Sequence, residues 1–309
     1  MTLTAYPNGV SSFGMPLIGS GPVLTTGNVF FVSSTASNAS NGNVGTSPDK
    51  PFATIDYAIG KCTAGNGDYI IAMPGHVETV AAAAGLAFDV AGVSLAGIGR
   101  GSARPKVNFT ATASTMTVSA ANVYIENIQF VPTIDAVVSP IIVSGADFTM
   151  FNFLLKDTSA TQVTDFIVTT AGASRMELAY FEYDGDTAAG TNAGIAIVGG
   201  DNIKIHDFIA DGNFAVGFID VRTTATTDLK VFNVPSFRTR NAADIFLVDT
   251  ITASTGTIGP DLNLRLQDNA ANITEALTGA TFVYFQPINI VNLAGESSMQ
   301  TNITASTDA

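Results

Sequence analysis

The clearest pattern along the chain is a set of short segments in which apolar and polar residues alternate. AANVYIENIQFVP, GADFTMFNFLLKD, GASRMELAYFEYD, GDNIKIHDFIADG and TTDLKVFNVPSFR begin at positions 120, 145, 172, 200 and 226, so they recur every 25 to 28 residues. Each segment starts with a small or polar turn, and another short apolar strand such as PIIVSG or AGIAIVGG precedes it. Short strands repeated at a fixed period are typical of a solenoid.

This period, with two or three strands and no helix per copy, predicts an all-β, right-handed parallel β-helix. Its coils stack ~4.8 Å apart through strand hydrogen bonds, and residues of one parity line a narrow interior. A β-sandwich is the alternative, but its strands need not keep such a repeat. Five apolar sets are expected to point inward: Val123, Ile125 and Ile128; Phe148, Met150 and Phe153; Met176, Leu178 and Phe181; Ile203, Ile205 and Phe208; Leu229, Val231 and Val234.

The pattern changes to a helical period before the repeats begin. Residues 28–34, NVFFVSS, predict a strand, whereas the apolar positions of PFATIDYAIGKC predict a helix over about 51–62. An exposed end coil of a solenoid invites aggregation unless something covers it. We therefore expect this helix to plug the N-terminal end of the solenoid. Cys62 falls on the apolar stripe, which favours a buried core thiol over a catalytic one.

The two ends of the chain differ from the repeats. Residues 1–27 contain three prolines and five glycines with isolated large apolar side chains between them, which predicts an extended arm. A disordered terminus is the alternative, but linkers seldom carry so many large apolar residues, so we expect the arm to dock on a neighbour. The β-helix domain then covers 28–292 and a C-terminal tail 293–309. The candidate contact residues of the arm are Tyr6, Phe13, Met15, Leu17 and Ile18.

Composition excludes several classes of fold and partner. Charged residues make up 13% of the chain, against a typical ~25%, which is too few for the solvent faces of an all-α protein. The net charge of −13, without a basic cluster, disfavours direct binding of nucleic acid. A single cysteine excludes an intrachain disulfide framework and a cysteine-rich zinc site. No segment reaches the ~20 apolar residues of a membrane span, and no secretory signal is visible at the start.

The entry segment NVFFVSS…NGNVGTSPDKPFATIDYAI…GDYIIAMPGHVET resembles that of pectin-lyase-like right-handed β-helix proteins. Together with the arm YPNGVSSFGMPLIG, it is similar to the β-helical structural proteins of tailed phages, including those that decorate or cement the head. The resemblance implies a virion protein on the outer capsid surface, made in the host cytoplasm. It also implies side-by-side association as a homotrimer, with the arms bound to the major capsid protein.

The resemblance also raises an enzymatic alternative, because many β-helix proteins are pectate lyases, polygalacturonases or polysaccharide-cutting tailspikes. Cleavage of a glycoside requires two carboxylates ~5 to 9.5 Å apart, and the candidates here are Glu182, Asp184, Asp207 and Asp211. Most such acids on a solenoid cap turns or face solvent. His76 and Glu78 together do not complete a metal site. We therefore expect no catalytic residue, metal or cofactor, and a decoration protein; a tailspike-like carbohydrate-binding or carbohydrate-cleaving protein is the alternative.

Overall fold

The structure describes most, but not all, of the chain. The computed structural model describes residues 10–12, 15–17, 25–158, 160–185, 191–239, 245–251, 253–266 and 282–292, with only the backbone at 10–12, 15–17, 266, 291 and 292. Met15 and Leu17 are thus placed by their backbone alone. Tyr6, Phe13, Ile18 and the tail at 293–309 lie outside the described residues.

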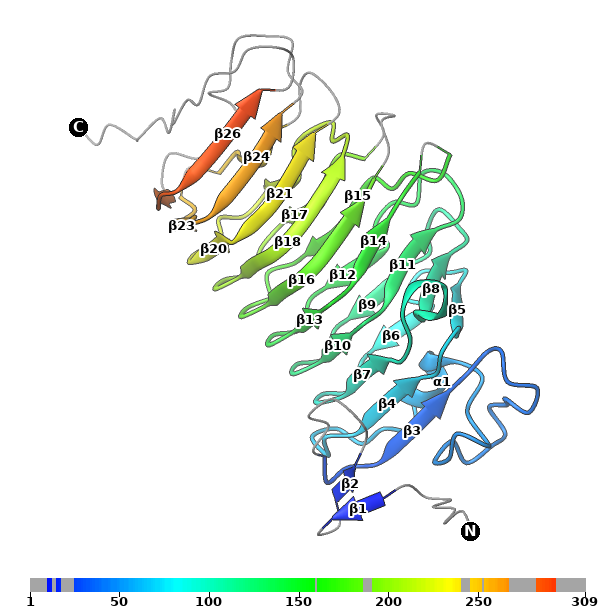
Figure 1. The fold of residues 1–309 in the computed structure, drawn as a ribbon. Helices are drawn as coiled ribbons and strands as arrows, with labels where there is room; N and C mark the ends of the chain where they lie inside the picture. The colour runs from blue at the N-terminus through cyan, green and yellow to red at the C-terminus, as the bar shows by residue number, and fades with distance from the viewer. Residues whose placement is uncertain are drawn as a thin grey trace, which may run out of the picture.

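The chain forms a right-handed parallel β-helix, as the repeat predicts (Figure 1). Three stacks of parallel strands wind around one interior. The first stack consists of β4 (Tyr69–Ala72), β7 (Ser94–Gly97), β10 (Tyr124–Glu126), β13 (Thr149–Phe151), the first half of β16 (Glu177–Asp184), the first half of β18 (Lys204–Gly212), β20 (Leu229–Phe232), β23 (Gly256–Ile258) and β25 (Phe282–Tyr284).

The second stack follows the first after a sharp corner in each coil. It consists of β5 (Val77–Val80), β8 (Lys106–Phe109), β11 (Gln129–Pro132), β14 (Leu154–Lys156), the second halves of β16 and β18, β21 (Val234–Thr239), β24 (Leu262–Leu266) and β26 (Ile288–Asn292). Because β16 and β18 continue through the corner, the two stacks form one sheet, of 17 strands among the described residues, which also includes β3 (Val29–Val32).

The third stack closes the solenoid as a separate sheet. It consists of β6 (Leu86–Phe88), β9 (Met116–Val118), β12 (Ile141–Val143), β15 (Asp165–Thr169), β17 (Ala193–Ile197), β19 (Ile219–Val221) and β22 (Leu247–Asp249). A short 3-10 helix, η1 (Gly101–Ala103), lies in the loop before β8. Within the described residues, no helix is long and apolar enough to cross a membrane.

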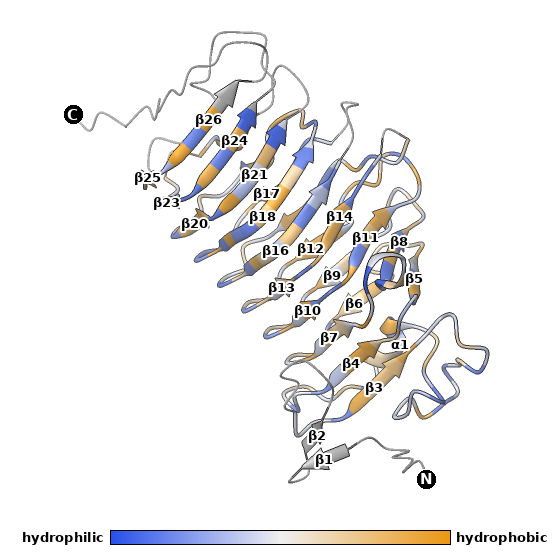
Figure 2. Cartoon of the chain, in the orientation of Figure 1, coloured by the Kyte–Doolittle hydropathy of each residue, from blue (hydrophilic) through white to orange (hydrophobic). Residues whose placement is uncertain are grey.

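The interior follows the predicted parity. Every residue of the five predicted inward sets is buried, and Figure 2 shows apolar and polar bands alternating along the strands. Phe153, Phe181 and Phe208 stack in successive coils with centroid separations of 4.6 and 4.7 Å and interplanar angles of 9°. Such pairs contribute about 0.5–1.5 kcal/mol each beyond the area they bury. The repeat therefore sets both the register and the packing of the core.

The predicted cap helix is present but shorter than its apolar period suggests. Helix α1 covers Ile55–Ile59, with Thr54 as its N-cap and Gly60 at its C-terminal end. It contacts β3, β4 and β6 and buries Ile55, Ala58 and Ile59. The carboxylate of Glu78 in β5 accepts the Ile55 N–H at 2.8 Å, so the first coil itself holds the start of the helix.

The free edge of the N-terminal strand is closed by a loop rather than by α1. The N–H of Phe31 donates to the Gly45 carbonyl at 2.7 Å, and the Phe52 N–H donates to the Phe31 carbonyl at 2.8 Å. The backbone N–H of Ser33 also donates, to the Phe52 carbonyl at 2.9 Å. These bonds use the outward-facing backbone groups of β3, which an uncovered edge strand would expose to other chains.

The interior register is tested by placing a carboxylate on each face of one strand. Ile205→Asp should lower the free energy of unfolding by about 2–7 kcal/mol, out of about 5–15 for a whole protein, because the buried acid has no partner. Ile209→Asp in the same strand is the matched control, since Ile209 is 48% exposed. Urea denaturation should separate the two variants clearly. Equal stabilities would contradict the register.

Candidate functional site

In five successive coils, the corner between the first two stacks is formed by one residue in the left-handed backbone conformation. Asn127, Asn152, Tyr180, Asp207 and Asn233 occupy equivalent positions in successive coils, with φ between 49° and 57°. Asparagine and aspartate tolerate this conformation because their short polar side chains hydrogen-bond locally. Tyrosine does so rarely, and Tyr180 is the exception in this column of corners.

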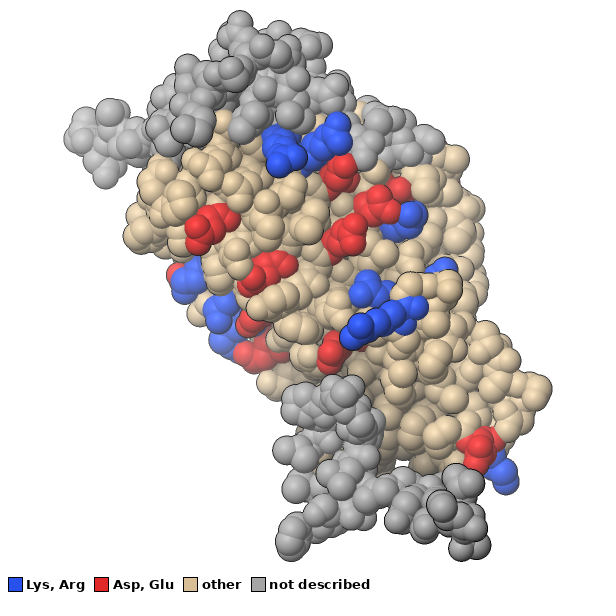
Figure 3. All heavy atoms as spheres, in the orientation of Figure 1, with Lys and Arg blue, Asp and Glu red and all other residues tan. Residues whose placement is uncertain are grey.

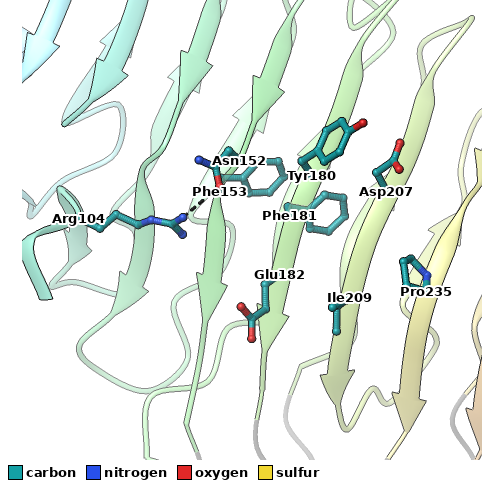
Figure 4. A pocket seen from close by; sticks show the side chains of 9 residues that line it. All are labelled: Arg104, Asn152, Phe153, Tyr180, Phe181, Glu182, Asp207, Ile209 and Pro235. Carbon is teal, nitrogen blue, oxygen red and sulfur yellow. Dashed lines mark hydrogen bonds between the residues drawn. The ribbon is translucent and has the colours of Figure 1, made fainter. Parts of the chain in front are cut away.

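A groove crosses the outer face of the sheet at these corners (Figure 4). It has a volume of about 410 Å³. Buried Phe153 and Phe181 lie at its base, and half-exposed Tyr180 stands at its side. Its lining residues come from η1's loop and from four neighbouring coils: Arg104, Asn152, Phe153, Tyr180, Phe181, Glu182, Asp207, Ile209 and Pro235.

Arg104 supplies the positive charge of the groove. Its Nη2 donates to Asn152 Oδ1 at 3.1 Å, and Asn152 Nδ2 in turn donates to Asn127 Oδ1 at 3.4 Å. The Arg104 Nε is buried and has no hydrogen-bond partner. Burial lowers the pKa of the guanidinium, whereas the charge of nearby Glu182 acts in the opposite direction. The guanidinium thus retains a donor that the protein does not use.

A hydrogen-bonded network occupies the other side of the groove. His206 Nδ1 lies 2.6 Å from Asp207 Oδ2, and His206 Nε2 lies 3.1 Å from Glu177 Oε1. The second oxygen of Asp207 accepts a hydrogen bond from the Asn233 side chain. Both ring nitrogens of His206 and both oxygens of Asp207 are therefore engaged, which fixes their orientation.

Outward-facing aromatic rings run beside the groove. The rings of Phe151 and Tyr180 lie 4.8 Å apart, and those of Tyr180 and His206 lie 6.5 Å apart. His206 stacks on Phe232 at 4.6 Å with an interplanar angle of 7°. Most phenylalanines do face the interior, as the sequence predicts, but this row gives the sheet an aromatic strip on its outer surface. Tyr180 is its most accessible member, with 55% of its surface exposed.

The structure separates the four candidate carboxylates into two pairs. Glu182 and Asp207 line the groove. Asp184 and Asp211 are register neighbours outside it, and Asp184 forms an ion pair of 2.5 Å with Lys156. Figure 3 shows acidic and basic side chains interspersed on this face, without a large patch of one sign.

Apart from Glu182 and Asp207, the lining residues were not among the site candidates from the sequence, and the polar ones that were missed are Arg104, Asn152 and Tyr180. The repeat contains a signal for Tyr180, because aligned copies read Asn, Asn, Tyr, Asp and Asn at the corner. Arg104 lies in a loop between repeats, so no sequence period indicates its position.

His76 and Glu78 form a buried pair in the N-terminal coil. His76 Nε2 lies 3.0 Å from Glu78 Oε2, which also accepts the Ile55 N–H. The pair joins β5 to the start of α1. Among the described residues, no three histidine, cysteine or acidic side chains group closely enough to hold a metal ion.

Cys62 lies beside the cap helix and is half-buried, somewhat less than its apolar stripe predicts. Its Sγ donates to the Ala58 carbonyl at 3.3 Å. Burial, and secondarily the charge of Asp68, raises the pKa of the thiol to about 12. A nucleophilic cysteine requires the opposite shift.

Comparisons with known proteins assign neither a family nor a function to the chain. No family model matches the chain, and no curated protein sequence matches it. A solved structure of a rhamnogalacturonan lyase is 12% identical to the chain, with a TM-score of 0.44 over 78% of this chain and 70% of the lyase chain.

The thiol of Cys62 should be nearly inert in the folded protein. A pKa of about 12 leaves it protonated at pH 8 and lets the thiolate form only as the pH rises well above that value. Its reaction with Ellman's reagent at pH 8 should be at least about a hundredfold slower than in guanidinium chloride, where the pKa returns to about 8.5. Equal rates in both solvents would show an accessible, activated thiol.

Proposed function

We propose that this chain is a non-enzymatic β-helical virion protein that binds a saccharide in the groove beside Tyr180. The observation that carries the proposal is the combination of an accessible aromatic ring with a guanidinium and carboxylates around one open groove. The assignment to a virion rests on the resemblance of the entry segment and arm to tailed-phage proteins.

The chemistry of the lining favours a sugar over an apolar ligand. A pyranose ring has a face of C–H groups that packs on an aromatic ring and a rim of hydroxyl groups that need hydrogen bonds. Tyr180 provides the ring, while the half-buried guanidinium of Arg104 and the exposed carboxylate of Glu182 provide donors and acceptors. An apolar ligand would leave these polar groups without partners, at a cost in binding free energy.

The charge of the groove favours a neutral saccharide. One guanidinium, of Arg104, faces the two carboxylates of Glu182 and Asp207, which leaves one negative charge in the groove. The whole chain carries −13. A polyuronate would be repelled by both charges. A neutral hexose-containing polysaccharide meets no such barrier.

The hydrogen bonds of the groove favour binding over cleavage. Hydrolysis of a glycoside needs two carboxylates in complementary roles. Asp207 is held on both oxygens, by His206 and Asn233, whereas the side chain of Glu182 has no hydrogen bond or ion pair within the described residues. The groove therefore offers one available carboxylate, which suits a hydrogen-bond acceptor to a bound sugar.

The proposal is tested first by binding and by turnover. The intact protein should bind neutral oligosaccharides on a glycan array that carries neutral and uronic-acid oligosaccharides in equal number. Incubation with the bound glycans should release no reducing ends and no unsaturated sugars. Absence of binding to every neutral glycan would refute the proposal. Turnover that Asp207→Asn or Glu182→Gln abolished would replace it by an enzymatic function.

The role of the guanidinium is tested by calorimetry with the neutral oligosaccharide that the array selects. Arg104→Gln should weaken binding at least about tenfold, because a charge-assisted hydrogen bond contributes about 1.5–3 kcal/mol. Arg175→Gln is the matched control, since Arg175 is exposed, lies outside the groove and pairs with Asp147. A similar loss in both variants would indicate a nonspecific effect of charge.

Capsid decoration is the second candidate, and the N-terminal arm supports it. Strands β1 (Val10–Ser12) and β2 (Met15–Leu17) form an antiparallel sheet of their own, without a ladder to any described strand of the solenoid (Figure 1). An arm of this kind is free to pack on a neighbouring protein. In this proposal three arms of a homotrimer bind the major capsid protein together, and avidity raises the affinity by ~10²–10⁴ over one contact.

Removal of the arm tests decoration separately from the groove. Thr25 is the first residue with a described contact to the first coil, through its hydroxyl to the Gly67 carbonyl, so deletion of residues 1–24 preserves that contact. The truncated protein should keep its thermal unfolding transition and its saccharide affinity but no longer sediment with capsids. Saturation of capsids by the truncated protein, or a monomeric intact protein at micromolar concentration, would contradict this candidate.

A further inference from the structure

We infer that Tyr180 is the residue on which the ligand ring stacks. A tyrosine in this left-handed corner costs conformational free energy, and we infer that it is retained for this contact. The inference rests on the proposed saccharide-binding function and adds to it that Tyr180 is retained at a strained corner for contact with the ligand. It comes from the comparison of equivalent corner positions in successive coils.

The neighbouring corners show what the fold itself favours at this position. Asn127, Asn152, Asp207 and Asn233 combine a left-handed backbone with side-chain hydrogen bonds between coils. Asn152 Nδ2 donates to Asn127 Oδ1, and the Asn233 side chain donates to Asp207. Tyr180 has the same backbone conformation, with φ 54°, but lacks the short polar side chain that continues this ladder.

Packing explains the tyrosine only in part. Its side chain is 55% exposed, and its ring contacts are to Phe151 and His206 on the outer surface. A bulky residue at positive φ is a rare arrangement that costs conformational free energy. Since more than half of Tyr180 remains exposed despite these contacts, its accessible face is the feature that a function would use.

The interruption of the ladder also shapes the groove around Tyr180. No asparagine lies between Asn152 and Asp207 in the ladder, so their side-chain oxygens bond to other residues. Asn152 Oδ1 accepts a hydrogen bond from Arg104 at 3.1 Å, and Asp207 Oδ2 lies 2.6 Å from His206 Nδ1. Figure 4 shows Arg104 reaching toward Asn152 on one side, with Tyr180 and Asp207 on the other. A neutral pyranose on the Tyr180 ring would have its hydroxyl groups within the reach of Arg104 and Glu182.

Arg175 provides an internal comparison in the same coil. It occupies the preceding left-handed corner, with φ 59°, where the neighbouring coils have Asp147 and Asn202. Its guanidinium forms two hydrogen bonds with Asp147, at 2.6 and 2.7 Å. Arg175 thus has a hydrogen-bonding partner in the adjacent coil, whereas the contacts of Tyr180 with adjacent coils are ring contacts with Phe151 and His206.

The experiment compares Tyr180→Asn, Tyr180→Phe and Arg175→Asn. Each variant is measured by thermal unfolding without ligand and by calorimetry with the neutral oligosaccharide selected on the array. Tyr180→Asn should raise the Tm by about 2–4 °C, because asparagine fits the left-handed corner, and should weaken binding at least about tenfold. Tyr180→Phe should lose no more than about threefold in affinity, and Arg175→Asn should bind as the unchanged protein does.

The outcomes distinguish this inference from the function on which it rests. Binding by the unchanged protein, together with affinity within twofold in Tyr180→Asn, would overturn the role of Tyr180 alone. A lower Tm together with lost binding would assign Tyr180 a structural role and also overturn the inference. No binding of any neutral glycan by the unchanged protein would refute the saccharide function and this inference together.

Discussion

The parallel hydrogen bonding between coils is the constraint on which the rest of the molecule depends. Each strand bonds to its equivalents on both sides, so every coil must turn at the same place as its neighbours. Variation in length, from 25 to 28 residues per copy, lies mainly in the connections, with one extra residue in β21 just after the corner, between Val234 and Phe237. The corner between the first two stacks therefore recurs at equivalent positions in successive coils. A residue type that differs from those in the neighbouring coils is easily recognised there.

This constraint explains why the sequence predicted the fold so well. The inward residues from Val123 to Val234 could be assigned from alternation alone, because a one-residue shift in register would turn a whole apolar set to solvent. The cap helix was less predictable. Its apolar period continues to Cys62, but Gly60 ends the helix, and the closure of β3 by Gly45 and Phe52 uses backbone groups that have no sequence pattern.

The candidate site was only partly predictable for a different reason. Glu182 and Asp207 could be recognised as acids on outward positions, but their sharing of one groove depends on neighbours from other coils. When the five repeats are aligned on their apolar sets, Tyr180 is the one corner residue that is neither asparagine nor aspartate. Arg104 comes from an irregular loop more than seventy positions before Tyr180 in the chain, and only the winding of the solenoid brings it to the same surface.

The closed N-terminal edge has a consequence for how copies of the chain can associate. A β-helix could in principle grow end to end, with the last coil of one molecule pairing with the first strand of the next, and such a head-to-tail contact would propagate into a filament. That contact needs a free acceptor edge on β3, which the loop of Gly45–Phe52 already occupies. Closing the edge of β3 is enough to block this contact, because a head-to-tail interface uses the last coil of one molecule and the first strand of the next. Head-to-tail growth through β3 is thereby disfavoured.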